Sequence, residues 1–228
     1  MFTNSVISGY CDVYESMGEN ANIKVVASGP YGKTFTQTGE GGHYVITGLG
    51  NGTYRLDFTK EGYGTIKMYN IQLFGNDTVN VSQVSLFEKY DKFVMPSLSN
   101  ISVETNQRFG PNPVVIIETD MSSSTGALPS PLPVVLFTDS IKNVSYINYT
   151  CVHPFIYPAF DDSGSGKIVF TFDPGYLPFK SGSEVFFIGY VCNPNEINNG
   201  YFDKYLGFDE LSTLIPEKHS QVMSFIMP

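Results

Sequence analysis

The sequence contains no tryptophan, only three cysteines and no cluster of basic residues. Lys and Arg number 13 among the 228 residues against 22 Asp and Glu, which gives a formal net charge of −9. Binding to nucleic acid requires grouped Lys and Arg that neutralise phosphates, so this composition argues against a nucleic-acid partner. The lack of tryptophan also weakens the case for stacking on sugar rings.

Long apolar runs and helical periodicity are missing as well. The longest apolar stretch, Val185 to Cys192, is far shorter than the roughly 20 residues that a membrane-spanning helix needs. The first ten residues, MFTNSVISGY, lack the basic and apolar regions of a secretory leader. We expect either a cytoplasmic chain or one from which a leader has been removed.

The three cysteines, Cys11, Cys151 and Cys192, are an odd number, which excludes a dense disulfide framework. Cys151 and Cys192 both fall on segments predicted to be strands. A bridge between them and two free core thiols both fit the sequence, and free buried cysteines are the commoner case.

What the sequence does have is apolar alternation with a period of two, repeated every 8 to 12 residues between turns rich in Gly, Asn, Asp and Pro. Together with 42% hydrophobic and 14% aromatic residues, this spacing predicts an all-β protein of sandwich type. The strands predicted in the first part cover residues 22–27, 43–47, 53–59, 65–74 and 78–87.

The segment FEKYDKFVMP at residues 87–96 is charged and ends in proline. It predicts two β-sandwich domains in tandem, residues 1–90 and residues 91–228. The second is expected to resemble an immunoglobulin or fibronectin-III sandwich, with a central strand at Val114 to Ile117 and a short helix near residues 208–214. Its predicted strands are 98–105, 113–120, 134–139, 144–152, 167–173, 184–192 and 220–226.

The glycines and tyrosines of the first domain are spaced in a recognisable way. The run TQTGEGGHY ends at Tyr44, and it is followed by ITGL at 46–49, GTYRL at 52–56 and KEGY at 60–63. Upstream, Gly9 and Gly18 precede the segment ANIKV at 21–25. Over residues 4–88 this pattern resembles the carboxypeptidase regulatory-like domain. No family is recognised for residues 97–228.

The resemblance implies a transthyretin-like (prealbumin-like) β-sandwich. Such modules are common in secreted and surface proteins of bacteria, often at the N-terminus of lipoproteins or outer-membrane receptors. The resemblance therefore favours a removed leader, which could have carried a lipid anchor, and a place outside the cell, at its surface or in the periplasm. The glycines are expected to make hairpin turns, and Tyr44, Tyr54, Leu56 and Phe58 to fill the core.

No catalytic constellation is found in the sequence. None of the three histidines, His43, His153 and His219, has a carboxylate three residues on, as a zinc carboxypeptidase site requires. The Ser-Gly strings at 162–166 and 180–183 lack the strand–elbow–helix context of a serine hydrolase. We therefore expect no enzyme, no cofactor and no metal.

Aromatic residues gather instead in the predicted loops of the second domain, and Tyr157, Tyr201 and Tyr205 are the first candidates for ligand binding. Aromatic rings stack on sugars and anchor protein partners; alternatively, these rings fold back over the ends of the sandwich. The expected function is a non-catalytic surface or periplasmic module in adhesion, assembly or nutrient capture, whose partner is a surface protein or a glycan. The alternative is a carbohydrate-binding module that uses the loop aromatics.

Overall fold

The computed structural model describes residues 4–14, 20–92, 98–105, 113–119, 134–154, 159–160, 168–172, 174–193, 195–196, 202–203, 208–209 and 211–228. It divides into two compact units, Met1–Lys89 with Gly200–Thr213, and Tyr90–Asn199 with Leu214–Pro228. The sequence predicts domains at residues 1–90 and 91–228, which places residues 200–213 in the second domain. The structure groups these residues with the first unit. Within that segment, Ser212 lies so close to Gly64 that a Cβ on Gly64 would overlap it.

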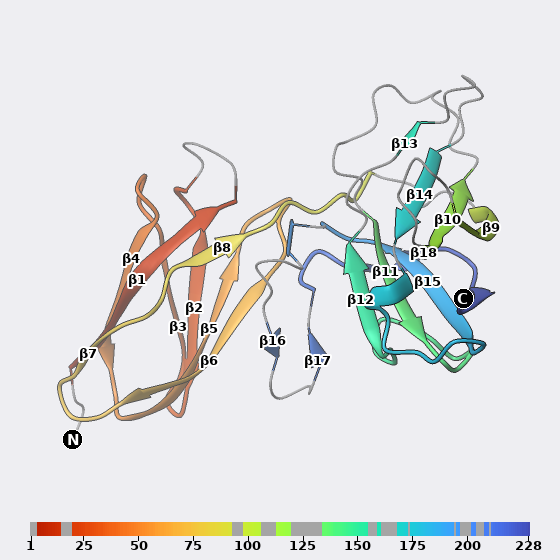
Figure 1. Cartoon of the computed structure of the whole chain (residues 1–228). Coiled ribbons are helices and arrows are strands. Elements are labelled where there is room, and N and C mark those ends of the chain that lie inside the picture. The colour runs from red at the N-terminus through yellow and green to blue at the C-terminus, as the bar shows by residue number, and fades with distance from the viewer. Residues whose placement is uncertain are drawn as a thin grey trace. The chain divides into compact units, whose positions relative to one another are not determined.

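The first unit is a sandwich of two sheets (Figure 1). One sheet has the order β4-β1-β7, with β8 also paired to β1, and the other has the order β3-β2-β5-β6. β7 and β8 run parallel to successive parts of β1, and the other pairs are antiparallel. The strands are β1 (Ser5–Val13), β2 (Lys24–Gly29), β3 (Gly32–Gln37), β4 (His43–Leu49), β5 (Gly52–Thr59), β6 (Ile66–Leu73), β7 (Thr78–Asn80) and β8 (Val84–Leu86).

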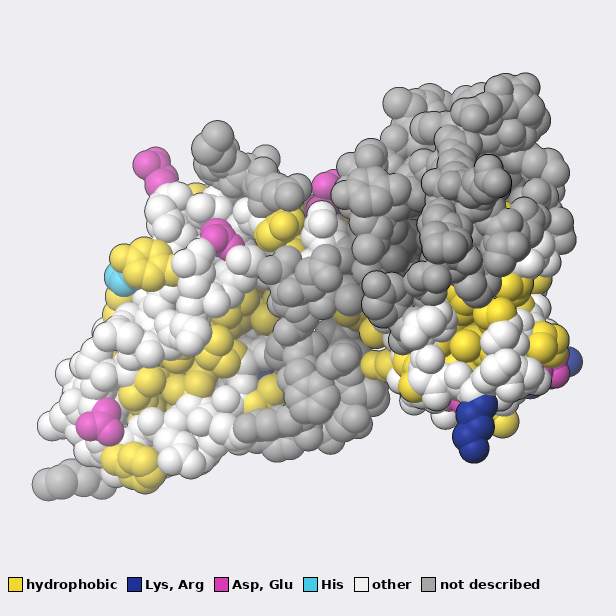
Figure 2. All heavy atoms as spheres, in the orientation of Figure 1, with side chains coloured by type: hydrophobic (Ala, Val, Ile, Leu, Met, Phe, Trp, Pro, Cys, Tyr) yellow, Lys and Arg dark blue, Asp and Glu magenta, His cyan; other side chains and the backbone are white. Residues whose placement is uncertain are grey.

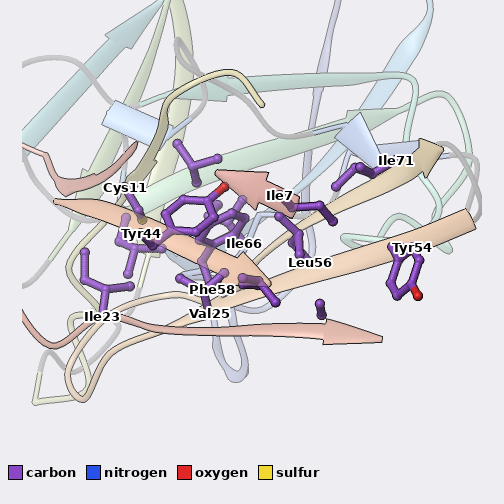
Figure 3. Close-up of a cluster of buried hydrophobic side chains, with 14 of the residues drawn as sticks. Ile7, Cys11, Ile23, Val25, Tyr44, Tyr54, Leu56, Phe58, Ile66 and Ile71 are labelled. Atoms are coloured by element: carbon purple, nitrogen blue, oxygen red, sulfur yellow. The ribbon is translucent and has the colours of Figure 1, made fainter. Parts of the chain in front are cut away.

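The core of this unit lies between the two sheets and follows the alternation of the sequence. Tyr44, Tyr54, Leu56 and Phe58 are all at most 4% exposed, as the sequence predicts. Figure 3 shows the Tyr44 and Phe58 rings together in the cluster; their centroids are 5.6 Å apart in an edge-to-face arrangement, a geometry that adds to the stabilisation from burial.

The β2–β3 hairpin turn packs on Gly50, just before β5, and on Gly52, the first residue of β5. A Cβ on Gly50 would lie 2.5 Å from Cε2 of Tyr31, and a Cβ on Gly52 would lie 2.5 Å from Cγ of Pro30. These two positions therefore need glycine because the turn of the neighbouring hairpin occupies the space of a side chain.

The second unit also contains two larger sheets, with the orders β13-β14-β10-β9 and β12-β11-β15-β18, and β19 pairs with β15. Val115, Ile116 and Ile117 on β10 are at most 9% exposed, and β10 has a neighbour on each side, so the predicted central strand is confirmed. The bounds are β9 (Leu98–Thr105), β10 (Pro113–Thr119), β11 (Val134–Asp139), β12 (Cys151–Pro154), β13 (Ala159–Phe160), β14 (Ile168–Phe172), the 3-10 turn η2 (Pro174–Tyr176), β15 (Glu184–Val191), β18 (Ile215–His219) and β19 (Met223–Ile226).

Two sequence-based predictions are wrong in this region. The strand predicted at 144–152 is mostly a tight turn. Ser145 and Asn148 exchange backbone hydrogen bonds, and the Asn148 side-chain amide donates a hydrogen bond of 2.7 Å to the carbonyl of Asn143. The short helix predicted near 208–214 is absent from the described part of that segment, which contains β17 (Phe208–Asp209), paired with β16 (Phe202–Asp203). The strands β1, β3, β13, β16 and β18 also lie outside the segments that the sequence predicts as strands.

Candidate functional site

The outer face of the β3-β2-β5-β6 sheet gathers side chains that are far apart in the sequence. The register places Phe35 opposite Val26, Val26 opposite Asp57, and Asp57 opposite Lys67, so one row crosses all four strands. Side chains of the neighbouring positions on the same face are Lys33, Ser28, Arg55 and Tyr69 on one side and Gln37, Lys24 and Thr59 on the other.

Two aromatic rings flank this face, and each lies beside a cation. Phe35 is 67% exposed, and the ammonium of Lys24 lies 5.2 Å from its ring centroid. On the opposite edge strand, the guanidinium carbon of Arg55 lies 6.0 Å from the centroid of Tyr69. Both distances fall within the range of cation–π attraction, which holds the long basic side chains over the sheet.

The charge of this face is opposite to that of the chain. It carries Lys24, Lys33, Arg55 and Lys67 against the single carboxylate of Asp57. We refer to the surface made by these residues with Phe35 and Tyr69 as the cationic face. In the view of Figure 2, by contrast, acidic side chains stand singly over the first unit.

The one acid of the cationic face is already engaged. Arg55 and Asp57 form a two-point ion pair, with Nε to Oδ1 at 2.7 Å and Nη2 to Oδ2 at 2.8 Å. The Nη2–H to Oδ2 hydrogen bond and the close Nε–Oδ1 contact together orient the guanidinium. A second anion approaching the face therefore meets an excess of positive charge.

A groove lies next to the cationic face, between the edge strands β3 and β4. Its volume is about 250 Å³, and it is lined by Tyr31, Gly32, Lys33, Thr34, Thr47, Gly48, Leu49, Gly50 and Tyr54. The Tyr54 hydroxyl is not free to bind a ligand strongly, since it donates to the carbonyl of Gly50 at 3.1 Å. The volume is below the roughly 300–1,000 Å³ of typical small-molecule sites, so it suits a side chain better than a cofactor.

The three tyrosines predicted from the sequence, Tyr157, Tyr201 and Tyr205, lie outside the described residues. Among the loop aromatics that the structure does describe, Phe179 of the second unit is partly buried and packs against the core that contains Phe187 and Leu177. At this position the aromatic ring covers the core. The cationic face was not predicted, because its residues belong to four separate strands.

None of the three cysteines, all of which the structure describes, forms a disulfide. Cys151 is opposite Thr138 at one end of β11, whereas Cys192 follows Val191, which is opposite Val134 at the other end. With a rise of about 3.3 Å per residue and strands about 4.8 Å apart, the Cα atoms are much too far apart for a bridge. Of the two alternatives for these cysteines, the structure supports thiols without a bridge.

Burial makes Cys11 an alkaline-sensitive residue. Its side chain is fully buried, and this burial, with a smaller effect from the charge of Asp12, raises the pKa of the thiol from 9.0 to about 12. Because the folded state holds the proton more tightly than the unfolded state, the thiol stabilises the fold fully below pH 9, and this stabilisation is lost as the pH rises toward 12.

We therefore expect wild type to lose about 1.4 kcal/mol more of its free energy of unfolding between pH 8 and pH 10 than the Cys11→Val variant. Urea unfolding of both proteins at the two pH values measures this difference. Equal losses would show that Cys11 does not titrate with the fold. Burial, with a smaller effect from the charge of Cys11, also raises the pKa of Tyr44. The effect of burial on Tyr44 is common to both proteins and cancels in the comparison.

The residues that the structure describes include no group of three or more His, Cys, Asp or Glu side chains that could hold a metal ion. They also include no helix that is both long and apolar enough to cross a membrane. His43 lies beside Tyr10, with ring centroids 5.0 Å apart, on the outer face of the β4-β1 pair.

No family model and no curated protein matches the sequence. Among solved structures, a mutant type II cohesin–X-dockerin complex from Acetivibrio cellulolyticus shares 17% identity at a TM-score of 0.32, over 37% of this chain and 58% of that one. A Bacteroides uniformis protein that is described as carbohydrate-binding shares 11% identity at a TM-score of 0.30, over 99% of this chain and 100% of that one. The major pilin subunit of Bacillus cereus shares 12% identity at a TM-score of 0.36, over 99% of this chain and 69% of that one.

These similarities are too low to carry a function over to this chain. The chain spans little more than half the length of the cohesin–X-dockerin chain that it matches.

Proposed function

We propose that this chain is a non-catalytic binding module of the bacterial cell surface or periplasm, which holds an acidic partner on the cationic face of its first unit. The observation that carries the proposal is the grouping of four cations and two flanking aromatic rings on one sheet face, in a chain whose net charge is −9. Opposite charge speeds encounter and orients a partner, and aromatic and Arg side chains are enriched where partners are held.

We also propose that residues 4–88 form a carboxypeptidase regulatory-like domain with a transthyretin-like sandwich, and that the second unit is immunoglobulin- or fibronectin-III-like. The residues that carry the first resemblance have structural roles: Tyr44 and Tyr54 are buried, and Gly48 and Gly52 adopt positive φ angles of 73° and 147°. Their roles in the fold leave binding to other residues. The proposed roles in adhesion, assembly or nutrient capture follow from such a module.

Binding to immobilised polyglutamate and polygalacturonate, with neutral dextran as a reference, tests the proposed function. We expect binding to the acidic polymers that weakens with salt. The combined Lys24→Gln, Lys33→Gln and Lys67→Gln variant should bind about tenfold more weakly, since exposed charge contacts contribute about 0.5 kcal/mol each.

The matched control is the Tyr157→Ala, Tyr201→Ala and Tyr205→Ala variant, which leaves the cationic face intact. We expect it to bind both acidic polymers like the wild type. Loss of binding in this variant alone would assign ligand binding to the loops and support the carbohydrate-binding alternative. Absence of binding to both acidic polymers, or turnover of either, would contradict the proposal.

A further inference from the structure

β3 is an edge strand whose backbone is paired on one side. Among the described residues its only strand partner is β2. The hairpin closes at Gly29 opposite Gly32, and farther along the N–H of Thr38 donates to the carbonyl of Ile23 at 3.0 Å. In an antiparallel pair the bonded positions alternate, so even-numbered residues of this strand bond to β2. The N–H and C=O groups of the intervening residues, including Phe35, point to the open edge.

The groove lies beside the first half of this open edge, at Gly32, Lys33 and Thr34. Successive side chains of a strand point to opposite faces, so a strand added to β3 places alternate side chains beside Phe35 on the cationic face and the others toward the groove. The groove wall offers Leu49, Tyr31 and the hydroxyl-bearing Thr34 and Thr47. Its volume of about 250 Å³ suits side chains of such a strand.

The local charge selects the partner. From Lys24 to Gln37 the chain has two lysines and no acidic residue, and residues 41–54 have no Asp, Glu, Lys or Arg. A second copy of this chain that paired through its own β3 would bring two Lys33 side chains to one edge, with a Lys24 on the next strand of each copy, which is unfavourable. An edge-strand lysine is a known device against self-pairing; here it leaves pairing with an acidic strand favourable.

We propose that the β3 edge and the adjoining groove bind an extended acidic segment of another polypeptide, which adds to the sheet as an antiparallel or parallel strand. Main-chain hydrogen bonds supply the affinity and the alternate side chains supply the specificity. This inference rests on the proposed function and names its partner: an acidic polypeptide strand that contacts Phe35 and Lys33 on one side and the groove on the other.

The test uses the full chain and the acetylated, amidated peptide Thr-Glu-Val-Thr-Val-Glu-Thr. We expect the backbone amides of Phe35 and Gln37 to exchange with solvent rapidly in the free protein and at least tenfold more slowly with saturating peptide, as measured residue by residue by NMR. A peptide with lysine in place of both glutamates should give no protection. If these amides were protected in a dimer without any peptide, the occupant of the β3 edge would be a second copy of this chain, and the proposed acidic partner would be wrong.

Two substitutions at one exposed position separate the backbone contribution from that of the ring. Phe35→Pro removes the N–H that points to the open edge without removing a β2–β3 hydrogen bond, whereas Phe35→Ala removes the ring and keeps that N–H. We expect Phe35→Pro to weaken peptide binding at least tenfold and Phe35→Ala only a few-fold. Equal effects of the two variants would refute strand addition.

The wild-type exchange measurement decides the matter even if Phe35→Pro fails to fold. Binding of acidic polymers through the lysines without protection of the β3 amides would contradict this inference while leaving the proposed function standing. Absence of binding to any acidic polymer or peptide would contradict both.

Discussion

The Phe58→Ala variant is expected to lose about 3–5 kcal/mol of the free energy of unfolding of the first unit. Phe58 is fully buried, and its ring meets the edge of Tyr44 at the centre of the core (Figure 3). Truncation removes the favourable transfer free energy of burying the ring. It also leaves a cavity between the two packed sheets, which cannot move together far enough to fill it. Urea unfolding followed by circular dichroism measures the loss.

Phe35→Ala is the matched control, because it removes the same side chain from a position that is 67% exposed. We expect its stability to stay within about 0.5 kcal/mol of the wild type, as for most surface substitutions. A similar loss in both variants would mean that burial does not decide the cost. It would also show that Phe35 is engaged in the fold and is not available to a partner.

The contrast between these two phenylalanines shows what the sequence reveals. Tyr54, Leu56 and Phe58 alternate with Arg55 and Asp57, so the buried face of β5 and its outer face can both be predicted from a period of two. β3 escapes the same reasoning. Its segment GKTFTQ places its one large apolar residue, Phe35, on the outer face, so no buried apolar stripe marks the strand.

The cationic face could not be predicted for a different physical reason. Lys24, Lys33, Arg55 and Lys67 are separated by up to 43 positions, and they become neighbours only when strand order and register are known. Register also depends on a local irregularity: β6 shifts against β5 where Asn70 adopts a positive φ of 59°. Without this extra residue the following side chains of β6 would point to the opposite face.

The Gly42→Ala variant is expected to lose about 2–4 kcal/mol of the free energy of unfolding, for two separate reasons. Gly42 has a φ of +78°, where a Cβ costs about 1–2 kcal/mol. A Cβ there would also overlap the carbonyl oxygen of Cys11. To avoid it, β1 and β4 must separate where the Cys11 N–H donates to the Gly42 carbonyl at 2.9 Å, which weakens a hydrogen bond that contributes about 1 kcal/mol.

Two other glycines separate these causes. Gly75 has a φ of +67° with open space around a Cβ, so Gly75→Ala carries the backbone cost alone, whereas Gly41 has open space and no such φ. We therefore expect the losses in urea unfolding to rise from Gly41→Ala through Gly75→Ala to Gly42→Ala. Equal losses for Gly75→Ala and Gly42→Ala would show that β1 and β4 yield to the added carbon at no cost. In the sequence, Gly41 and Gly42 are indistinguishable neighbours; the strand that passes behind Gly42 makes the second irreplaceable.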